Sequence, residues 1–233
     1  MPSGNSARPD RPAPLHASAL VSDLRSFEHQ LDGWWSDRLL GTLVSALTLH
    51  DSDSATHSER VAALAMDLAH EVGYAPGSEE AREIWRGALM HDVGKLGVSA
   101  EILQKPGPLD EVEWAEIRKH PEFGYLMLRD IPQLAATAEM IFASHERWDG
   151  RGYPRGLTAE QIPLGARIFI IADAWDAMTS DRPYRRAMPL EQAVQEVRDN
   201  RGTQFDPMVA DALQQLLTRP GSRWIDGSGS AAA

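Results

Sequence analysis

Apolar residues recur along this chain at intervals of three and four positions, the spacing of one face of an α-helix. Two clear series are Trp35, Leu39, Leu43 and Leu47, then Val61, Leu64, Leu68 and Val72. Further along the chain, the same pattern predicts helices at about 80–92, 110–119, 121–129, 132–145, 163–179, 189–200 and 206–218. The chain is therefore expected to consist mainly of helices.

Prolines and one β-rich run bear on this interpretation. Pro163, Pro189 and Pro207 stand near the predicted starts of three helices, where a residue without an N–H group costs little. The run from Ile168 to Ile171 would suit a buried strand by itself, but its length and the alanine-rich residues that follow favour a buried helix. No strand-like alternation is sustained elsewhere, so we predict an all-α fold, a single helical bundle.

The ends of the chain differ in composition from its middle. Residues 1–19 contain four prolines and almost nothing to bury, which predicts a disordered tail. Residues 221–233 end in Gly, Ser and Ala, which predicts a flexible C-terminus. No Gly/Ser-rich linker interrupts the rest of the chain. We expect residues 20–50 to form a helical segment packed on the core, and residues 51–220 to form the functional domain.

Charge and cysteine content argue against several classes of protein. Lys and Arg number 23 against 34 Asp and Glu, a formal net charge of −11, which disfavours broad binding to a nucleic acid polymer or an anionic membrane. Cysteine is absent, which excludes disulfides, a thiolate nucleophile and a cysteine-based zinc site. No apolar run approaches the ~20 residues of a membrane span, and no signal-peptide core is present. We expect a cytoplasmic protein.

Candidate chemistry lies in histidines and aspartates at predicted helix ends and loops. In chain order they are His57, the adjacent pair His91 and Asp92, His120, His145 and Asp173. Imidazole and carboxylate ligands together suit a divalent transition metal such as Fe, Mn, Co or Zn. An adjacent His–Asp pair can direct one ligand to each of two metals, with the carboxylate as a bridge. The remaining histidines are interpreted as ordinary core or surface residues: His16, His29, His50 and His70.

Longer motifs connect these residues to a known family. The sequence HSERV is followed by HDVGK, by HERWDGRGYPRGLTAEQIPLGARIFIIADAWDAMTSDRPYRRA and by GTQFDP. In this order they resemble the HD-GYP branch of the HD phosphohydrolases over about residues 50–217. The resemblance includes Gly152, Tyr153 and Pro154, the tripeptide from which the branch takes its name. The resemblance implies an HD-type all-α bundle with a bi- or trinuclear metal centre. It also implies hydrolysis of cyclic di-GMP to linear pGpG, GMP or both.

The resemblance also implies a set of metal ligands. Carried over position by position, they are His57, His91, Asp92, His120, His145 and Asp173, with Asp92 as the bridge. Asp53 stands four residues before the first ligand, where some family members have a glutamate that supports a third metal. It is either a further ligand or a cap of the helix that begins near His57. The expected cofactors are two or three divalent transition metal ions, with Fe or Mn favoured.

One position departs from the family pattern. The family shows two adjacent histidines before the Glu-x-Trp-Asp-Gly sequence, whereas this chain has Ser144 before His145. Serine is a poor ligand for such metals, so we expect Ser144 not to coordinate and one coordination position to be vacant or filled by water. The missing imidazole would weaken the binding of one metal or alter its redox behaviour.

The expected reaction is attack on phosphorus by a hydroxide that bridges two metals. Asp92 and Lys95 are the predicted catalytic residues, because Lys95 follows nearly one helical turn later and can stabilise the transition-state charge or orient the nucleophile. Arg182 and Arg185 match family positions that bind the second phosphate of the substrate. Asp176 is predicted to lie near the metal-side face, where it contacts substrate or water or forms a salt bridge.

Two alternatives to this function stay open. Base selection depends on loop shape, so another cyclic dinucleotide such as cyclic GMP-AMP is an alternative substrate. A catalytically weakened module that binds the nucleotide, or a partner protein through the Gly152-Tyr153-Pro154 loop, is an alternative of another class. Ser144 favours that second alternative, whereas the retained ligand positions and Lys95 favour an enzyme.

Overall fold

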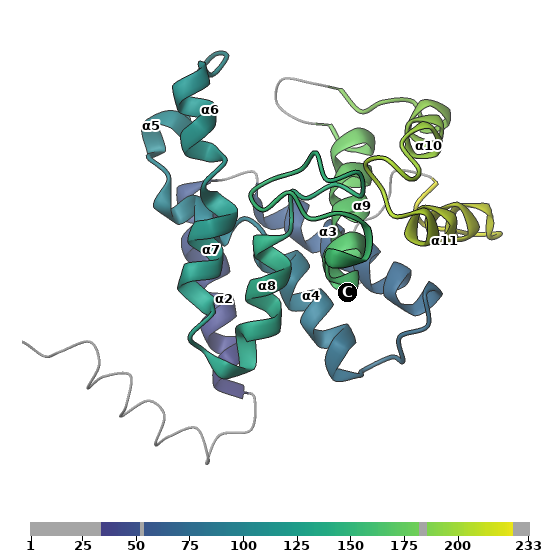
Figure 1. Ribbon diagram of the computed structural model, residues 1–233, viewed down its shortest axis with the longest axis horizontal. Coiled ribbons are helices and arrows are strands. Elements are labelled where there is room, and N and C mark those ends of the chain that lie inside the picture. Colours follow the sequence, from purple (N-terminus) through teal and green to yellow (C-terminus); the bar gives the residue numbers. More distant parts are fainter. Residues whose placement is uncertain (1–33, 52–53, 182–185, 226–233) are drawn as a thin grey trace, which may run out of the picture.

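Figure 1 shows the computed structural model, which describes residues 34–51, 54–181 and 186–225. The α-helices of this part are α2 (Trp34–His50), α3 (Ser54–Glu71), α4 (Glu79–Met90), α5 (Ala100–Leu103), α6 (Glu111–Ile117), α7 (His120–Leu128), α8 (Ala135–Phe142), α9 (Leu164–Thr179), α10 (Leu190–Asp199) and α11 (Pro207–Thr218). Three short 3-10 helices are η1 (Val93–Gly97), η2 (Pro132–Leu134) and η3 (Ala159–Gln161). The predicted all-α fold is confirmed.

The helix boundaries follow local signals in the sequence. Pro163 and Pro189 directly precede α9 and α10, and Pro207 is the first residue of α11. The run Ile168 to Ile171 lies inside α9 and is buried, as predicted. The predicted helix over 132–145 is shorter in the structure, because it begins as η2 and α8 ends at Phe142. Residues 143–145, which include Ser144 and His145, form a turn after α8.

Side-chain caps explain several helix starts. Ser78 accepts a hydrogen bond from the backbone N–H of Ala81 at the start of α4. Asp110 and Glu113 form a reciprocal capping box at the start of α6. Asp206 accepts hydrogen bonds from the first turn of α11. These caps satisfy backbone donors that would otherwise have no partner.

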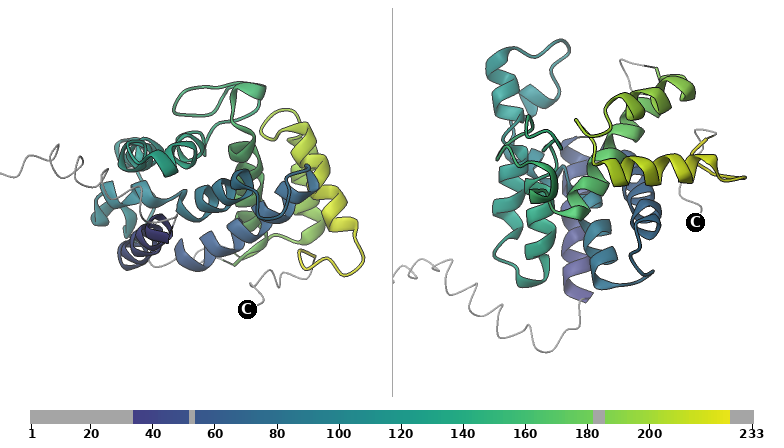
Figure 2. Two further views of the ribbon diagram at one scale, coloured as in Figure 1. Left: turned by 90° about the horizontal axis from the view of Figure 1, so that it is seen from below. Right: turned by 45° about the vertical axis from the view of Figure 1, so that its right-hand side comes forward.

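Two hydrophobic clusters form the core. The larger one joins α3, α4, α9, α10 and α11, with Phe169 and Trp175 of α9 fully buried within it. The smaller one, which includes Leu40 of α2 and Leu128 of α7, joins α2, η1, α7 and α8. Helix α4 packs against α3 and α9 on one side and against α8 on the other. The C-terminal end of α4 lies where the two clusters meet, because Ala88 belongs to the larger cluster and Met90 to the smaller one. Figure 2 shows the arrangement of the helices from two further sides.

Helix α2 and the residues that follow α11 both pack on the rest of the fold. Leu40 and Leu47 of α2 are buried, and α2 contacts α3, α4 and η1. Residues 1–33, with the predicted disordered tail, lie outside the described residues. Trp224 packs in the larger cluster and its Nε1 donates to Asp67 Oδ2 at 2.8 Å. Packed structure thus runs past residue 220, where we placed the start of a flexible end.

Helices α5 and α6 form an arm that extends beyond α7 in Figures 1 and 2. Neither helix contains a buried residue, and Val112 and Trp114 of α6 are exposed. Within residues 34–51, 54–181 and 186–225, none of the helices is long and apolar enough to cross a membrane.

Candidate metal centre

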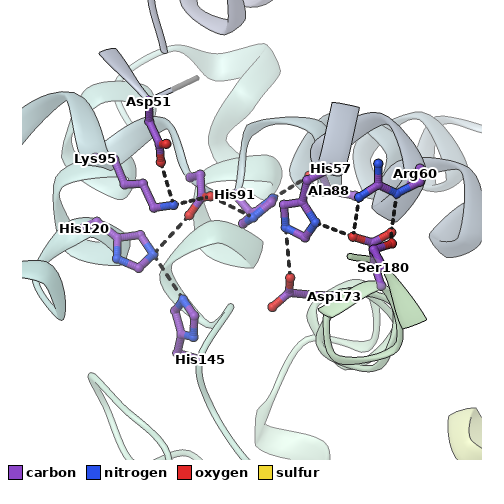
Figure 3. A network of polar contacts seen from close by, with 12 residues as sticks. Asp51, His57, Arg60, Ala88, His91, Lys95, His120, His145, Asp173 and Ser180 are labelled. Atoms are coloured by element: carbon purple, nitrogen blue, oxygen red, sulfur yellow. Dashed lines mark hydrogen bonds and ion pairs between the residues drawn. The ribbon is translucent and has the colours of Figure 1, made fainter. Parts of the chain in front are cut away.

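A cavity of about 520 Å³ opens beside the C-terminal end of α4, where His91 and Asp92 line it. It is bordered by α3, α9, the end of α4, and the segment from α6 to the start of α7. The residues that we predicted as ligands, catalytic residues or substrate contacts and that the structure describes all line it: His57, His91, Asp92, Lys95, His120, His145, Asp173 and Asp176. Residues more than 100 positions apart in the sequence are thus brought together at one site (Figure 3).

The end of α4 supplies two of these residues. His91 caps the C-terminus of α4, and Asp92 is the first residue before η1. The turn then packs so closely on α7 that a Cβ on Gly94 would lie 1.8 Å from the backbone oxygen of His120 and 2.5 Å from the backbone nitrogen of Gly124. Only glycine allows this approach. The close packing places the start of α7, with His120, beside Asp92.

The turn of η1 directs Lys95 back toward Asp92. Lys95 Nζ lies 2.7 Å from Asp92 Oδ2 and 3.1 Å from Asp51 Oδ2. Asp51 directly follows α2 and also lines the cavity. The ammonium group therefore lies between two carboxylates at the wall of the cavity, as Figure 3 shows.

Hydrogen bonds at Nδ1 orient two of the histidines. His91 Nδ1 lies 2.8 Å from the carbonyl oxygen of Ala88, and His120 Nδ1 lies 2.8 Å from that of Ile117. Because a carbonyl oxygen only accepts, each Nδ1 carries the proton, and in the neutral ring each Nε2 presents a lone pair to the cavity. This arrangement is typical of metal-ligating histidines.

The third histidine of the centre is held by a side chain. His57 Nδ1 lies 2.7 Å from Asp176 Oδ2, and His57 Nε2 lies 3.1 Å from Asp173 Oδ1. Donor atoms of His57, His91 and Asp92 all lie within 4.8 Å of one another. One group of donors is therefore formed by residues of α3, α9 and the end of α4.

A second group of donors lies on the other side of Asp92. Asp92 Oδ2 is 3.3 Å from His91 Nε2, whereas Asp92 Oδ1 is 3.7 Å from His120 Nε2. His145 Nε2 in turn lies 3.1 Å from His120 Nε2. The two oxygens of Asp92 thus face different imidazoles, which is the arrangement that a bridging carboxylate requires.

The loop that follows His145 fixes its ring. The rings of His145 and Tyr153 stack with centroids 5.0 Å apart and planes 3° from parallel. The buried carboxylate of Glu146 accepts hydrogen bonds from the backbone of Arg155 and Leu157. The loop also needs Gly152, since a Cβ there would lie 2.4 Å from the backbone of Glu146. The Gly-Tyr-Pro loop therefore folds back on the centre.

The protonation states of the donors suit a metal. Burial lowers the pKa of His120 to about 4 and also lowers the pKa of His145. Although burial opposes ionisation, the neighbouring His91 ring and the Lys95 ammonium hold the pKa of Asp92 well below its usual value. Near neutral pH these residues are therefore in the deprotonated forms that bind metals.

His57 behaves differently from these histidines. Although burial disfavours its charged form, hydrogen bonds to Asp173 and Asp176 raise the pKa of His57 to about 9. The metal-free centre therefore holds a proton between two carboxylates near neutral pH. A divalent ion would replace that proton. The donor set, imidazoles and carboxylates in one cavity, fits divalent transition metals of intermediate softness.

The other predicted residues either lie away from the cavity or are not described by the structure. Ser144 is buried, its Oγ has no hydrogen-bond partner among the described residues, and it is not among the residues that line the cavity. Asp53, Arg182 and Arg185 lie outside the described residues. Asp181 directly precedes residues 182–185, which the structure does not describe, and it lines the cavity.

The sequence analysis missed several residues of the cavity wall, among them Asp51, Arg60 and Trp114. Asp51 contacts Lys95, Arg60 contacts Asp176, and Trp114 of α6 lines the cavity while 49% exposed. Arg60 stands three residues after His57, so it shares a helix face with a predicted ligand. That spacing was the available signal. Nothing in the spacing of Asp51 or Trp114 distinguishes them from surface residues.

Several curated proteins are similar to this chain. A 3'3'-cGAMP-specific phosphodiesterase of Vibrio cholerae is 42% identical over 166 residues, which are 70% of this chain and 35% of that protein. A cyclic di-GMP phosphodiesterase of Thermotoga maritima is 39% identical over 71% of this chain and 45% of that protein. The cyclic di-GMP phosphodiesterase response regulator RpfG of Xanthomonas campestris is 38% identical over 75% and 46%. The chain spans less than half the length of these relatives.

Solved structures share the fold. A cyclic GMP-AMP specific phosphodiesterase of V. cholerae superimposes with a TM-score of 0.61 at 20% identity, covering 82% of this chain and 50% of that one. An HD-GYP protein of Bdellovibrio bacteriovorus has a TM-score of 0.56, also at 20% identity, covering 71% and 52%. Residues 42–209 match the family model described as HD domain. This chain therefore belongs to the HD domain family, and the resemblance to its HD-GYP branch is confirmed.

Proposed function

We propose that this chain is a metal-dependent phosphodiesterase that hydrolyses cyclic di-GMP. The observation that carries the proposal is the convergence of four histidines and two aspartates on one cavity, with Lys95 at its wall. The relatives named as cyclic di-GMP phosphodiesterases support the choice of substrate. Hydrolysis would add water across one P–O bond to give linear pGpG, and across the second to give GMP.

The two groups of donors on either side of Asp92 would each hold one ion. The first group is His57, His91, Asp173 and Asp92 Oδ2, and the second is His120, His145 and Asp92 Oδ1. Divalent ions bound there supply positive charge for the phosphate and lower the pKa of water to give a nucleophile near neutral pH. We propose Fe or Mn, since both accept mixed imidazole and carboxylate ligands. Asp53 stays a candidate either for a ligand of a third ion or for a cap of α3.

Lys95 is proposed to stabilise negative charge on the reacting phosphate. Although burial opposes its charged form, Asp92 and Asp51 raise the pKa of Lys95 above its ordinary value, so the ammonium stays charged at working pH. It lines the cavity within reach of the bridge carboxylate. A fixed positive charge at this wall stabilises charge that develops in the transition state.

The far ends of the substrate would meet other walls of the cavity. Trp114 presents aromatic surface there, which suits stacking on a guanine base. Arg182 and Arg185 stay the predicted partners of the second phosphate, and their neighbour Asp181 lines the cavity. Both carboxylate oxygens of Asp176 accept hydrogen bonds from protein groups, which favours a salt bridge over direct contact with substrate.

A second candidate substrate is 3'3'-cGAMP, because one relative at 42% identity carries that specificity in its name. The cavity offers the aromatic surface of Trp114, which suits stacking on guanine and adenine alike. The Gly152-Tyr153-Pro154 loop is also proposed to bind a partner protein, and Gly152 and Tyr153 are partly exposed. A cytoplasmic location stays a prediction from composition.

The test is turnover by the purified chain. Protein stripped of metal would be reconstituted without oxygen with Mn²⁺ or Fe²⁺ and incubated with cyclic di-GMP or 3'3'-cGAMP, and products separated by chromatography. We expect metal-dependent conversion of cyclic di-GMP to linear pGpG and then GMP. The Asp92→Asn variant, which changes the bridge, serves as the inactive control.

Other results of this assay would assign a different substrate or a different function. Faster hydrolysis of 3'3'-cGAMP than of cyclic di-GMP would assign the second substrate. Tight binding of cyclic di-GMP without hydrolysis under both metals would make the chain a nucleotide-binding module. Metal analysis of the same samples shows whether an inactive sample had actually been loaded.

A further inference from the structure

A chain of hydrogen bonds links α3 and α9 behind the metal centre. Arg60 Nε lies 2.6 Å from Asp176 Oδ1, and Arg60 Nη2 lies 2.9 Å from Asp176 Oδ2. Asp176 Oδ2 also lies 2.7 Å from His57 Nδ1, and Ser180 Oγ donates to Asp176 Oδ1 at 3.0 Å. Figure 3 shows Arg60 on the side of His57 opposite to His145. One buried carboxylate thus joins a guanidinium to a predicted metal ligand.

The support of His57 differs from that of the other ligands. His91 and His120 donate from Nδ1 to backbone carbonyls three residues earlier, whereas His57 uses the side chain of Asp176 on another helix. A carboxylate partner orients an imidazole and raises its strength as a ligand. This partner has rotatable bonds, so its own position has to be fixed.

The electrostatics of the site explain why Asp176 needs Arg60. Its side chain is only 8% exposed, and Asp173, another carboxylate, stands one helical turn away on α9. A buried carboxylate without a counter-charge is strongly destabilising. Arg60, 24% exposed, supplies the counter-charge through two parallel N–H donors, the geometry that a guanidinium offers and an ammonium does not.

We propose that Arg60 is a positioning residue of the metal centre, which fixes Asp176 and thereby the ring orientation and ligand strength of His57. The inference rests on the metal binding that the proposed function requires, and Arg60 acts on the ligand His57 through Asp176. The supporting residues follow the predicted ligands at the same spacing on both helices. Arg60 stands three residues after His57 on α3, and Asp176 stands three residues after Asp173 on α9. On each helix a ligand is followed by a residue that supports a ligand.

The experiment measures Mn²⁺ binding in the absence of any nucleotide. The 233-residue chain, stripped of metal, would be titrated with Mn²⁺ by calorimetry, and bound Mn²⁺ would be followed by electron paramagnetic resonance. For Arg60→Ala we expect about tenfold weaker binding at one class of sites, the lower end of the usual effect of removing a supporting partner, together with a changed Mn²⁺ spectrum. For Asp176→Asn, which acts directly on His57, we expect a larger loss.

Two further variants separate positioning from general stability. Arg60→Lys retains the charge but not the pair of parallel donors, so we expect an intermediate affinity. Arg167→Ala removes another arginine–carboxylate pair of low exposure, between Arg167 and Asp206, which contacts no predicted ligand. We expect Arg167→Ala to lower the melting temperature while Mn²⁺ affinity stays at the wild-type value.

The proposal is overturned if Arg60→Ala and Arg60→Lys bind Mn²⁺ with wild-type affinity and spectrum, whatever their melting temperatures. Should Arg60→Ala not fold, Arg60→Lys still decides the matter by the same titration. The titration contains no substrate, so a wild-type chain that fails to hydrolyse cyclic di-GMP would remove the proposed function and leave this inference standing.

Discussion

The two sides of the metal centre hold their ligands by different means. On the side of α4 and α7, His91 and His120 are oriented by backbone carbonyls, those of Ala88 and Ile117. On the side of α3 and α9, His57 is oriented by the side chain of Asp176, which lies 119 positions further along the chain. The same imidazole chemistry is thus positioned by local backbone on one side and by tertiary contacts on the other.

The difference predicts how each side fails. A backbone acceptor comes with the helix, so a side-chain substitution cannot remove it, and only a displaced backbone can. A carboxylate acceptor can be removed by one substitution, and it needs a counter-charge such as Arg60. We therefore expect the α4–α7 side to respond to changes in backbone packing, and the α3–α9 side to changes in charge.

The largest effect is expected from Gly94→Ala, which tests the backbone side. The new Cβ would overlap the backbone oxygen of His120, so η1 and α7 must separate. We expect a loss of about 3 kcal/mol or more in the free energy of unfolding, at the upper end for overpacking. His120 and Lys95 would move apart, and metal-dependent turnover would be lost. Urea unfolding followed by circular dichroism measures the first effect.

Gly107→Ala is the matched control for that variant. Nothing lies within 4 Å of a Cβ on Gly107, in the loop between α5 and α6. We expect wild-type stability and turnover from it. A Gly94→Ala protein as stable as Gly107→Ala would mean that η1 does not depend on close packing against α7.

The next largest effect is expected from Lys95→Ala, which removes a charge from the α4–α7 side without moving the backbone. Turnover of cyclic di-GMP should fall about 100-fold to 1,000-fold, the usual cost of removing one group that stabilises a transition-state oxyanion. Metal content should stay unchanged. Lys105→Ala, which removes an ion pair with Glu113 on the arm, is the control and should retain full turnover. Full turnover by metal-loaded Lys95→Ala would exclude the proposed role, and loss of metal would make Lys95 a partner of Asp92 instead.

The contrast between the two sides also explains which features of the fold and of the site could be predicted from the sequence. Helix periodicity placed α9, and the motif at the end of α4 placed His91 and Asp92, because these features depend on neighbours in the chain. The pairing of Arg60 with Asp176 joins residues 116 positions apart, and no pattern within one sequence shows that two i, i+3 pairs on different helices face each other. The exposure of Trp114 to the cavity depends on the direction of the arm, which is likewise a tertiary property.

A smaller effect is expected at the arm, from Trp114→Ala. If the indole stacks on a base of the substrate, its removal should raise KM by about tenfold, within the range of base–aromatic stacking, and leave kcat unchanged. Trp85→Ala is the control, because Trp85 of α4 is similarly exposed but is not among the residues that line the cavity. An unchanged KM for Trp114→Ala would assign the indole to the surface of the arm alone.

The smallest effects are expected at Ser144, and they compare the two groups of donors directly. The group with His120 and His145 has one donor fewer than the group with His57, so Mn²⁺ titration of the wild-type chain should resolve a strong and a weak class of sites. Ser144 directly precedes His145, at the position where the family has a second histidine. Ser144→His should therefore tighten the weak class alone, whereas Arg60→Ala should weaken the other.

Ser144→Ala supplies the control that a missing ligand requires. The hydroxyl of Ser144 is buried without a hydrogen-bond partner among the described residues, so its removal should leave Mn²⁺ affinity unchanged. It should also raise the free energy of unfolding by up to about 1 kcal/mol, because an unsatisfied buried polar group is removed. Weaker Mn²⁺ binding by Ser144→Ala would make the serine itself a ligand. Unchanged affinity in Ser144→His would mean that neighbouring residues already complete the second group, and that the two sides of the centre differ in their supports but not in their ligands.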